Sequence, residues 1–224
     1  MSFIVAIDGP AGTGKGTIAK NISQELGYIN IDTGAMYRSI TLELLEKGIN
    51  NIKDKEEIIK IANNINIDLT EENEVYLNGK NVTKEIRTEK VNSFVSEVSS
   101  IPEVRNIMIK LQRKMAENKN VVMEGRDITT VVFPNADVKI FLDADVEERA
   151  KRRYNEMNEK GIAITFEEVL DSIKLRDFKD KNKPVGALKI ADDAIIIDTT
   201  NLSIKQVTEE IINIILDKIG KERK

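Results

Sequence analysis

Short runs rich in apolar and β-branched residues alternate along the chain with longer segments of helical periodicity. The short runs predict strands buried in a sheet; they comprise residues 3–7, 28–31, 121–123, 138–142 and 195–197. The longer segments repeat apolar residues every three or four positions; they comprise residues 14–26, 34–47, 54–61, 88–99, 102–118, 146–160, 165–181 and the stretch that Ser203 begins. This order predicts an α/β fold, an open parallel sheet of about five strands flanked by helices.

One region departs from this alternation. Residues 66–69 and 75–77 alternate between apolar and polar positions, and Asn78 and Gly79 follow them. Such alternation beside an Asn-Gly pair is typical of an antiparallel hairpin. We therefore expect a small antiparallel β insertion within the α/β pattern.

Composition restricts the chemistry that the chain can perform. The 224 residues include no histidine and no cysteine, which excludes His- or Cys-based zinc sites, histidine triads, thiolate nucleophiles and disulfides. The net charge of −4 disfavours generic nucleic-acid binding through a basic surface. The N-terminus lacks a signal-peptide pattern and the chain lacks a long apolar run, so we expect a cytoplasmic protein with no membrane partner.

A glycine-rich segment follows the first predicted strand and opens the first predicted helix. It reads Gly9, Pro10, Ala11, Gly12, Thr13, Gly14, Lys15, Gly16, Thr17, and it has the phosphate-loop spacing of Gly, four residues, Gly-Lys. The backbone N–H groups of such a loop converge on an anion, and Lys15 and the helix N-terminus add positive charge. Gly16 stands where Ser or Thr is usual, so Thr17 supplies the nearest hydroxyl. The segment predicts a nucleoside triphosphate site; the alternative is a glycine-rich turn with a surface lysine.

Further motifs extend along the chain, and together they resemble one family. They are DTGAMYR at 32–38, EGRDI at 124–128, VVFP at 131–134, EERAKRR at 147–153 and ADDA at 191–194. With the phosphate loop, these motifs resemble the bacterial cytidylate kinases, P-loop kinases of the nucleoside monophosphate kinase group, over essentially the whole chain. The resemblance implies a core of residues 1–32, 100–153 and 189–224, a CMP-binding lobe of residues 33–99 that carries the β insertion, and a short helical lid of residues 154–188.

The resemblance also implies a reaction. A phosphoryl group would pass from MgATP to CMP or dCMP, giving CDP or dCDP and ADP, with small nucleotides as the partners, no nucleic acid, and a monomeric enzyme. Mg²⁺ would be held mainly by ATP phosphates and water. Thr17 and Asp32 are candidates to orient that water, although Asp32 serves equally well as a helix cap.

The family's site residues map onto this sequence one by one. For the CMP phosphate they are Thr33, Tyr37, Arg38 and Arg126; for the cytosine, Ser96, Arg105 and Asp127; for the sugar, Arg176 and Asp180. On the ATP side and in the lid they are Arg149, Arg153 and the lysines near Asp180, among which Lys183 is also expected to reach the substrate. Those expected to act in catalysis are Lys15, Arg38, Arg126, Asp127 and Arg176.

Elementary chemistry agrees with the base-reading assignment. The Asp127 carboxylate can accept from the N4 amino group of cytosine, while Arg105 and Ser96 can donate to N3 and O2. Uracil presents an acceptor where cytosine has its amino group, and that acceptor would face the carboxylate unfavourably. Arg38 and Arg126 suit a phosphate because a guanidinium can donate two parallel hydrogen bonds.

Simpler interpretations of these residues stay open. Arg38 could be a solvated helix arginine, Gly125 to Asp127 a turn with a surface ion pair, and Ser96 a plain surface residue. Arg149, Arg152 and Arg153 could form a solvated basic face, which is the interpretation we favour for Arg152. At the level of function, the alternatives are a P-loop kinase for UMP, AMP or a non-nucleotide, and a nucleotide-binding module without transferase activity.

The chain departs from the family pattern at a few positions. Thr129 stands where glycine usually follows Gly-Arg-Asp-Ile, and Ala187 stands where a proline is usual. Lysines replace the usual arginines of the lid; they are Lys179, Lys181 and Lys183. Lysine keeps the charge of arginine but loses its planar fork of donors.

Overall fold

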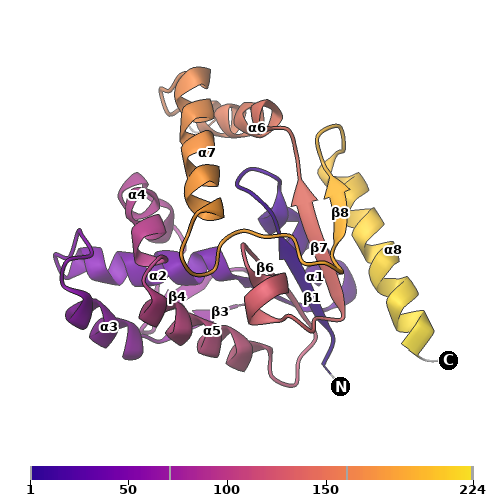
Figure 1. Ribbon diagram of the computed structural model, residues 1–224, viewed down its shortest axis with the longest axis horizontal. Coiled ribbons are helices and arrows are strands. Elements are labelled where there is room, and N and C mark those ends of the chain that lie inside the picture. Colours follow the sequence, from indigo (N-terminus) through magenta and orange to yellow (C-terminus); the bar gives the residue numbers. More distant parts are fainter. Residues whose placement is uncertain (1, 71, 160, 223–224) are drawn as a thin grey trace.

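A five-stranded parallel sheet forms the centre of the molecule in the computed structural model, which describes residues 2–70, 72–159 and 161–222 (Figure 1). Its strands, in spatial order, are β2 (Ile29–Asp32), β6 (Val121–Gly125), β1 (Ile4–Asp8), β7 (Val138–Asp143) and β8 (Ile195–Asp198). Every neighbouring pair runs parallel. The predicted α/β fold and its parallel sheet are confirmed.

Alternate residues of the central strands pack against different helices. Val5 and Ile7 of β1 join an apolar cluster with α1 (Lys15–Leu26) and α8 (Ile204–Glu222). Ala6 lies between them in the sequence and joins the opposite cluster, with α2 (Thr33–Glu46) and α5 (Pro102–Ala116). This division follows from the two-residue repeat of a strand, and it places the sheet between two helical layers.

Capping residues set several of the helix starts. The Asp32 carboxylate accepts a hydrogen bond from the Ala35 N–H at 2.7 Å and so caps α2. Asp54 caps α3 (Lys55–Asn63) in the same way, and the Ser203 hydroxyl accepts from the Gln206 N–H at the start of α8. Asp54 and Ser203 thus cap their helices, and the cap interpretation of Asp32 is confirmed.

The predicted helix boundaries needed small corrections. The helix expected over 102–118 ends at Ala116, because Asn118 has a φ of 58°, which no helix can continue through. Lys160, where another predicted helix ends, lies outside the described residues, as do residues 1, 71 and 223–224.

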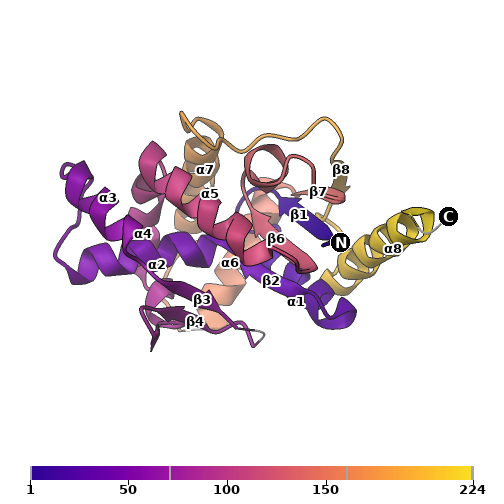
Figure 2. The ribbon, with the colours of Figure 1, turned by 90° about the horizontal axis from the view of Figure 1, so that it is seen from below.

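The antiparallel insertion lies beyond β2 and α2 (Figure 2). It consists of β3 (Ile67–Leu69), β4 (Val75–Leu77) and the short β5 (Lys80–Asn81). Asn78 and Gly79 connect the last two strands with φ values of 50° and 84°, as a tight hairpin turn requires. A 3₁₀ turn, η1 (Glu85–Arg87), and α4 (Glu89–Val98) then lead back to α5. The predicted β insertion is confirmed.

Two helices stand apart beyond the carboxyl end of β7 (Figure 1). They are α6 (Val146–Glu159) and α7 (Phe166–Lys181), and they share a small apolar cluster of their own around Ala150, Val169 and Ile173. Within the described ranges, no helix has the length and apolar content that a membrane crossing requires.

The central strands should carry most of the stability of the fold. Ile140 of β7 is fully buried, so Ile140→Ala should lower the free energy of unfolding by about 2–4 kcal/mol through lost burial and a residual cavity. Ile196→Ala is the matched control, because Ile196 lies on the neighbouring strand but is 56% exposed. Urea denaturation measures both, and equal losses in the two variants would contradict this account of the core.

Candidate functional site

Three loops meet at the carboxyl ends of neighbouring parallel strands. The phosphate loop follows β1, α2 begins directly after β2, and the Gly125–Asp127 turn follows β6. Since β6 lies between β1 and β2, the three loops are adjacent in space although residues 9 and 127 are far apart in the sequence. This edge of an open α/β sheet is the usual place for a ligand.

The glycine-rich segment has the backbone of a phosphate loop. Gly12 and Gly14 have φ values of 84° and 86°, which curl the chain just before α1 begins at Lys15. The Lys15 ammonium is buried and donates to the Pro10 carbonyl oxygen at 2.6 Å. Burial, together with the charge of the nearby Arg126, lowers the pKa of Lys15 to about 7. An anion in the loop would favour the charged lysine, so the loop is built for a negative ligand.

Arg149 on α6 reaches the phosphate loop, whereas its neighbours do not. Its guanidinium donates to the Ala11 and Ala144 carbonyl oxygens, both at 3.0 Å, and pairs with Asp177 of α7 at 2.7 Å. Arg153 pairs with Glu156 on the surface of the same helix. The structure therefore brings Arg149 to the loop, while Arg153 lies close enough to Arg176 for its charge to lower the pKa of Arg176.

Arg152 corrects the interpretation that we favoured from sequence. It was expected on a solvated basic face, yet its guanidinium donates to the carbonyl oxygens of Thr199 and Thr200, which follow β8. The side chain is only partly exposed and ties α6 to the loop after the last strand. Charge alternation on a helix could not reveal a partner almost fifty residues away.

Two carboxylates lie side by side at the ends of β2 and β6. Asp32 and Glu124 are register partners in neighbouring strands. Burial, together with the neighbouring Asp32 carboxylate, raises the pKa of Glu124 to about 7. Although burial opposes it, Arg38 and the Ala35 N–H hold the pKa of Asp32 below its usual range. Glu124 was missed as a site residue; its place at the end of a buried strand, directly before Gly-Arg-Asp, was the available signal.

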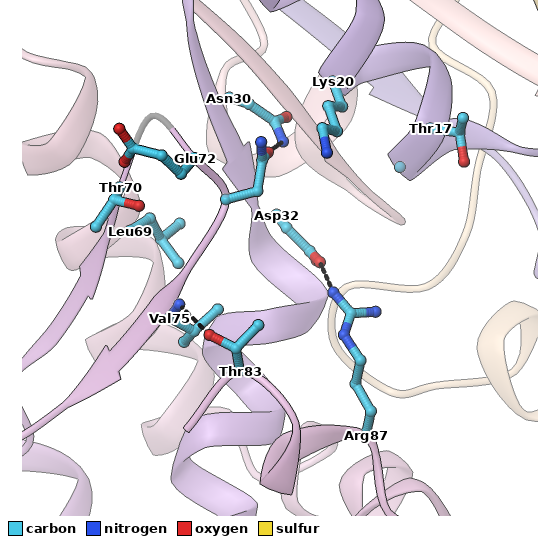
Figure 3. A pocket seen from close by; sticks show the side chains of 12 residues that line it. Thr17, Lys20, Asn30, Asp32, Leu69, Thr70, Glu72, Val75, Thr83 and Arg87 are labelled. Atoms are coloured by element: carbon cyan, nitrogen blue, oxygen red, sulfur yellow. Dashed lines mark hydrogen bonds and ion pairs between the residues drawn. The ribbon is translucent and has the colours of Figure 1, made fainter. Parts of the chain in front are cut away.

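A hollow of about 550 Å³ opens beside these carboxylates (Figure 3). Gly16, Thr17 and Lys20 of the loop and α1 line one side, and residues of the β insertion line the other. Arg87 of η1 reaches across to Asp32, with 3.9 Å between the nitrogen and oxygen atoms. Thr17 and Asp32, the two predicted candidates for orienting water, thus line the same space.

Arginines predicted for the phosphate and the sugar of the acceptor converge from α2, the turn after β6, and α7. Arg38 pairs with Asp32 at 3.0 Å, and Arg126 pairs with Asp180 at 2.8 Å. Desolvation of the guanidinium, together with the charge of Arg126, lowers the pKa of Arg176 to about 10. The Thr33 hydroxyl donates to the Glu124 carbonyl oxygen at 2.7 Å, so Thr33 lies beside the end of β6, directly before the turn that carries Arg126.

Two predicted base-reading residues form a buried ion pair. The Arg105 guanidinium donates to the Asp127 carboxylate and to the Ser99 carbonyl oxygen, and it lies 5.5 Å above the centre of the Tyr37 ring. Gly186 packs so closely on this guanidinium that a Cβ there would collide with it. Ser96 lies one helical turn before Ser99, half-buried. Ser99 and Gly186 had no sequence signal, because Ser99 meets Arg105 through its backbone carbonyl and Gly186 contributes only the absence of a side chain.

The end of α7 connects the lid helices to both sides of the site. Lys183 pairs with Asp180 at 3.0 Å and donates to the Ser99 hydroxyl at 3.1 Å. Although burial opposes it, Arg126 and Lys183 lower the pKa of Asp180 to about 2. Lys179 and Lys181 are exposed on the same helix. Among the lysines that replace family arginines, the structure brings Lys183 into the site.

Solved structures with the same overall fold are known. The match to a gluconokinase from Sinorhizobium meliloti covers 98% of that chain and all of this one, with a TM-score of 0.50 at 11% identity. An uncharacterized protein from Eubacterium ventriosum gives a TM-score of 0.52 at 15% identity, over 96% of this chain and 98% of its own. Such low identities show the shared fold alone.

Sequence comparison then gives the family. The cytidylate kinase family model matches residues 5–217. Proteins described as cytidylate kinases are similar over nearly the full length: one from Fusobacterium nucleatum is 54% identical over 98% of both chains, and one from Caldanaerobacter subterraneus is 50% identical over 94% of this chain and 93% of its own. The chain belongs to the cytidylate kinase family, and the predicted resemblance is confirmed.

The buried Glu124 should make the stability of the unliganded protein depend on pH. Its folded pKa of about 7 exceeds its unfolded value of 4.5, so between these values the folded state holds a proton that the unfolded state has lost. The free energy of unfolding should therefore fall as pH rises from about 4.5 to 7. Glu124→Gln should remove this fall, measured by urea denaturation at pH 5, 6 and 7. Parallel curves for the two proteins would show that Glu124 is ionised throughout.

Proposed function

We propose that this chain transfers the terminal phosphoryl group of MgATP to CMP or dCMP, giving ADP and CDP or dCDP. The observation that carries the proposal is the meeting of Lys15 and its loop, Arg126, and the buried Arg105–Asp127 pair at one edge of the sheet. The loop suits a donor triphosphate, and the pair suits an acceptor base. The names of the full-length relatives point to the same acceptor.

The donor would lie over the phosphate loop. Backbone N–H groups at the start of α1 and the Lys15 ammonium would hold its phosphates. Lys15 would leave the Pro10 carbonyl to do so, and the phosphate charge would restore its ordinary protonated state. Arg149 would keep the loop in place from α6, through the Ala11 carbonyl oxygen.

The residues at this site fit the Mg²⁺ that the family implies. Glu124, Asp32 and Thr17 offer the oxygen atoms that Mg²⁺ prefers, and a cation there would stabilise the ionised form of Glu124. Across the described ranges, no cluster of three or more Asp, Glu, His or Cys side chains could hold a metal, so its other ligands would be phosphate oxygens and water. When bound, Mg²⁺ supplies charge neutralisation at the transferred group.

The acceptor would lie between α2, β6 and α7. Arg38 and Arg126 would bind its phosphate and place one phosphate oxygen in line with the donor, while Arg176 would contact the sugar. That oxygen is already a nucleophile, so no histidine is needed as a base. Asp127 would accept from the cytosine amino group, while Arg105 would exchange part of its pairing with Asp127 for the base. Asp180 and Lys183 lie where they can meet the sugar and the phosphate.

Other expectations from sequence stay predictions. They include the domain boundaries, the monomeric state, the cytoplasmic location and the absence of a nucleic-acid partner. None of them affects the chemistry at the sheet edge.

Removing the Lys15 ammonium should abolish transfer. Lys15→Ala deletes the cation that would neutralise the transferred group, so we expect a loss in kcat of about 10³-fold or more with the fold intact. The coupled release of ADP in the presence of CMP measures it. Lys205→Ala, an exposed lysine on α8, is the control and should retain full activity. Activity of Lys15→Ala within tenfold of the unmutated protein would reject this loop as the donor site.

Asp127 should determine the choice between cytosine and uracil. The unmutated protein should use UMP at least about tenfold less well than CMP, because the uracil O4 would face a carboxylate. Asp127→Asn should narrow this difference in kcat/KM, since an amide can either donate or accept. Asp192→Asn, an exposed aspartate before β8, is the control and should leave the ratio unchanged. Equal use of both monophosphates by the unmutated protein would refute the base-reading scheme.

A further inference from the structure

One further carboxylate lies between the phosphate loop and the turn that follows β6. Asp8 is the last residue of β1, directly before the phosphate loop, and it is fully buried. Its Oδ1 accepts from the Ile128 N–H at 2.9 Å. Its Oδ2 accepts from the Thr129 N–H at 2.7 Å and from the Thr129 hydroxyl at 2.6 Å.

These contacts satisfy the start of η2 (Ile128–Val132), the π-helical turn that follows Arg126 and Asp127. The first N–H groups of a helical turn have no partner within it, and a side chain just before the turn usually supplies one. Asp127 occupies that place but does not cap η2, because its carboxylate pairs with Arg105 instead. Asp8 supplies the missing acceptor from a different strand, which leaves Asp127 available to a base.

Thr129 is the unusual partner in this arrangement. Glycine, the residue that the family resemblance leads us to expect at this position, would offer the N–H but no hydroxyl. Here the hydroxyl is buried and gives Asp8 its shortest hydrogen bond. With the two N–H groups, the hydroxyl gives the carboxylate three hydrogen-bond donors. A carboxylate that is ionised away from water needs such donors.

The charges around Asp8 compete. Burial raises the pKa of Asp8 and Asp127 adds to the rise, while the hydrogen bonds from Thr129 and Ile128 lower it. Lys15 and Arg126 face the same carboxylate, and Asp8 favours their charged forms. Loss of the Thr129 hydroxyl would therefore favour protonation of Asp8 and weaken its hold on η2.

We infer that Asp8 and Thr129 form a clasp that positions Arg126 and Asp127 relative to the phosphate loop. The Asp8 carboxylate, directly before the phosphate loop, holds the backbone of Ile128 and Thr129, directly after Asp127. The donor and acceptor sides therefore keep their spacing. Asp8 and Thr129 are positioning residues, since neither reaches a nucleotide. The inference rests on the proposed function for its effect on turnover, but the clasp itself has an effect on stability that can be measured without substrate.

The clasp is tested with Thr129→Val, which keeps the shape and removes the hydroxyl, and Thr129→Ser, which restores a hydroxyl. In Thr129→Val we expect kcat/KM for CMP to fall roughly tenfold, as for a lost hydrogen bond to a charged group. We also expect the acid limb of the pH profile of kcat/KM to move to higher pH. Thr129→Ser should recover most of both. Thr130→Val, one residue further along, should match the unmutated protein. Identical pH profiles for the Val and Ser variants would overturn the inference.

Urea denaturation from pH 4 to 7 provides the readout that is independent of the reaction. A further rise in the folded pKa of Asp8 makes the folded state lose stability as pH rises above the unfolded value of 3.8. The deficit of Thr129→Val should therefore grow with pH, and Thr129→Ser should abolish that growth. A deficit constant with pH would refute the clasp even if CMP is phosphorylated. If the unmutated protein fails to phosphorylate CMP but the deficit grows, the proposed function fails and the clasp remains.

Discussion

Charged groups crowded together at the carboxyl edge of the sheet, most of them buried or partly buried, are the constraint on which the rest of the structure depends. Lys15, Arg126 and Arg176 lie close enough that Arg126 lowers the pKa of both the others. Asp8, Glu124 and Asp180 lie among them, and burial opposes the charge of each. Neither set could be buried alone, because an unpaired charge in protein costs several kcal/mol. Together the two sets form an electrostatic frame that is incomplete until phosphate arrives.

The parallel sheet is what brings these groups together. A parallel sheet directs all its carboxyl ends to one edge, so residues that directly follow strands meet there whatever their separation along the chain. Asp8, Asp32 and Glu124 are terminal residues or near-terminal residues of three adjacent strands. The apolar strand interiors, covered on both faces, hold these ends rigidly, and rigid elements position reacting groups better than loops do. The fold thus converts ordinary hydrophobic burial into precise placement of charge.

Much of this could be predicted from sequence because it is local. Strand runs, helix periodicity, the Asn78-Gly79 turn and the phosphate loop each depend on residues within about ten positions of one another. The missed features depend on distant partners. Thr129 meets Asp8 across 121 positions, and Arg152 meets Thr199 across 47. Ser99 contributes its backbone carbonyl oxygen, and Gly186 leaves room for the Arg105 guanidinium because it has no side chain. The residue type alone predicts neither contribution. Among the site residues expected from sequence, Lys15, Asp32 and Asp127 lie at one edge of the sheet because their motifs adjoin strand ends, whereas Arg105 and Arg149 reach the same edge from helices.

The ion pairs of the unliganded site anticipate the ligand. In the function that we propose, three ion pairs each hold a cation that would bind phosphate or base; they are Arg126 with Asp180, Arg38 with Asp32 and Arg105 with Asp127. Such pairing avoids the cost of a buried free charge, and it also keeps the guanidinium groups near the orientation that a ligand needs. Binding then exchanges one partner for another rather than ordering a mobile side chain. Only a ligand that offers both an anion and a hydrogen-bonding base can replace all the partners at once, because an anion alone would leave the Arg105–Asp127 pair unchanged. Selectivity for a nucleotide over free phosphate follows from that exchange.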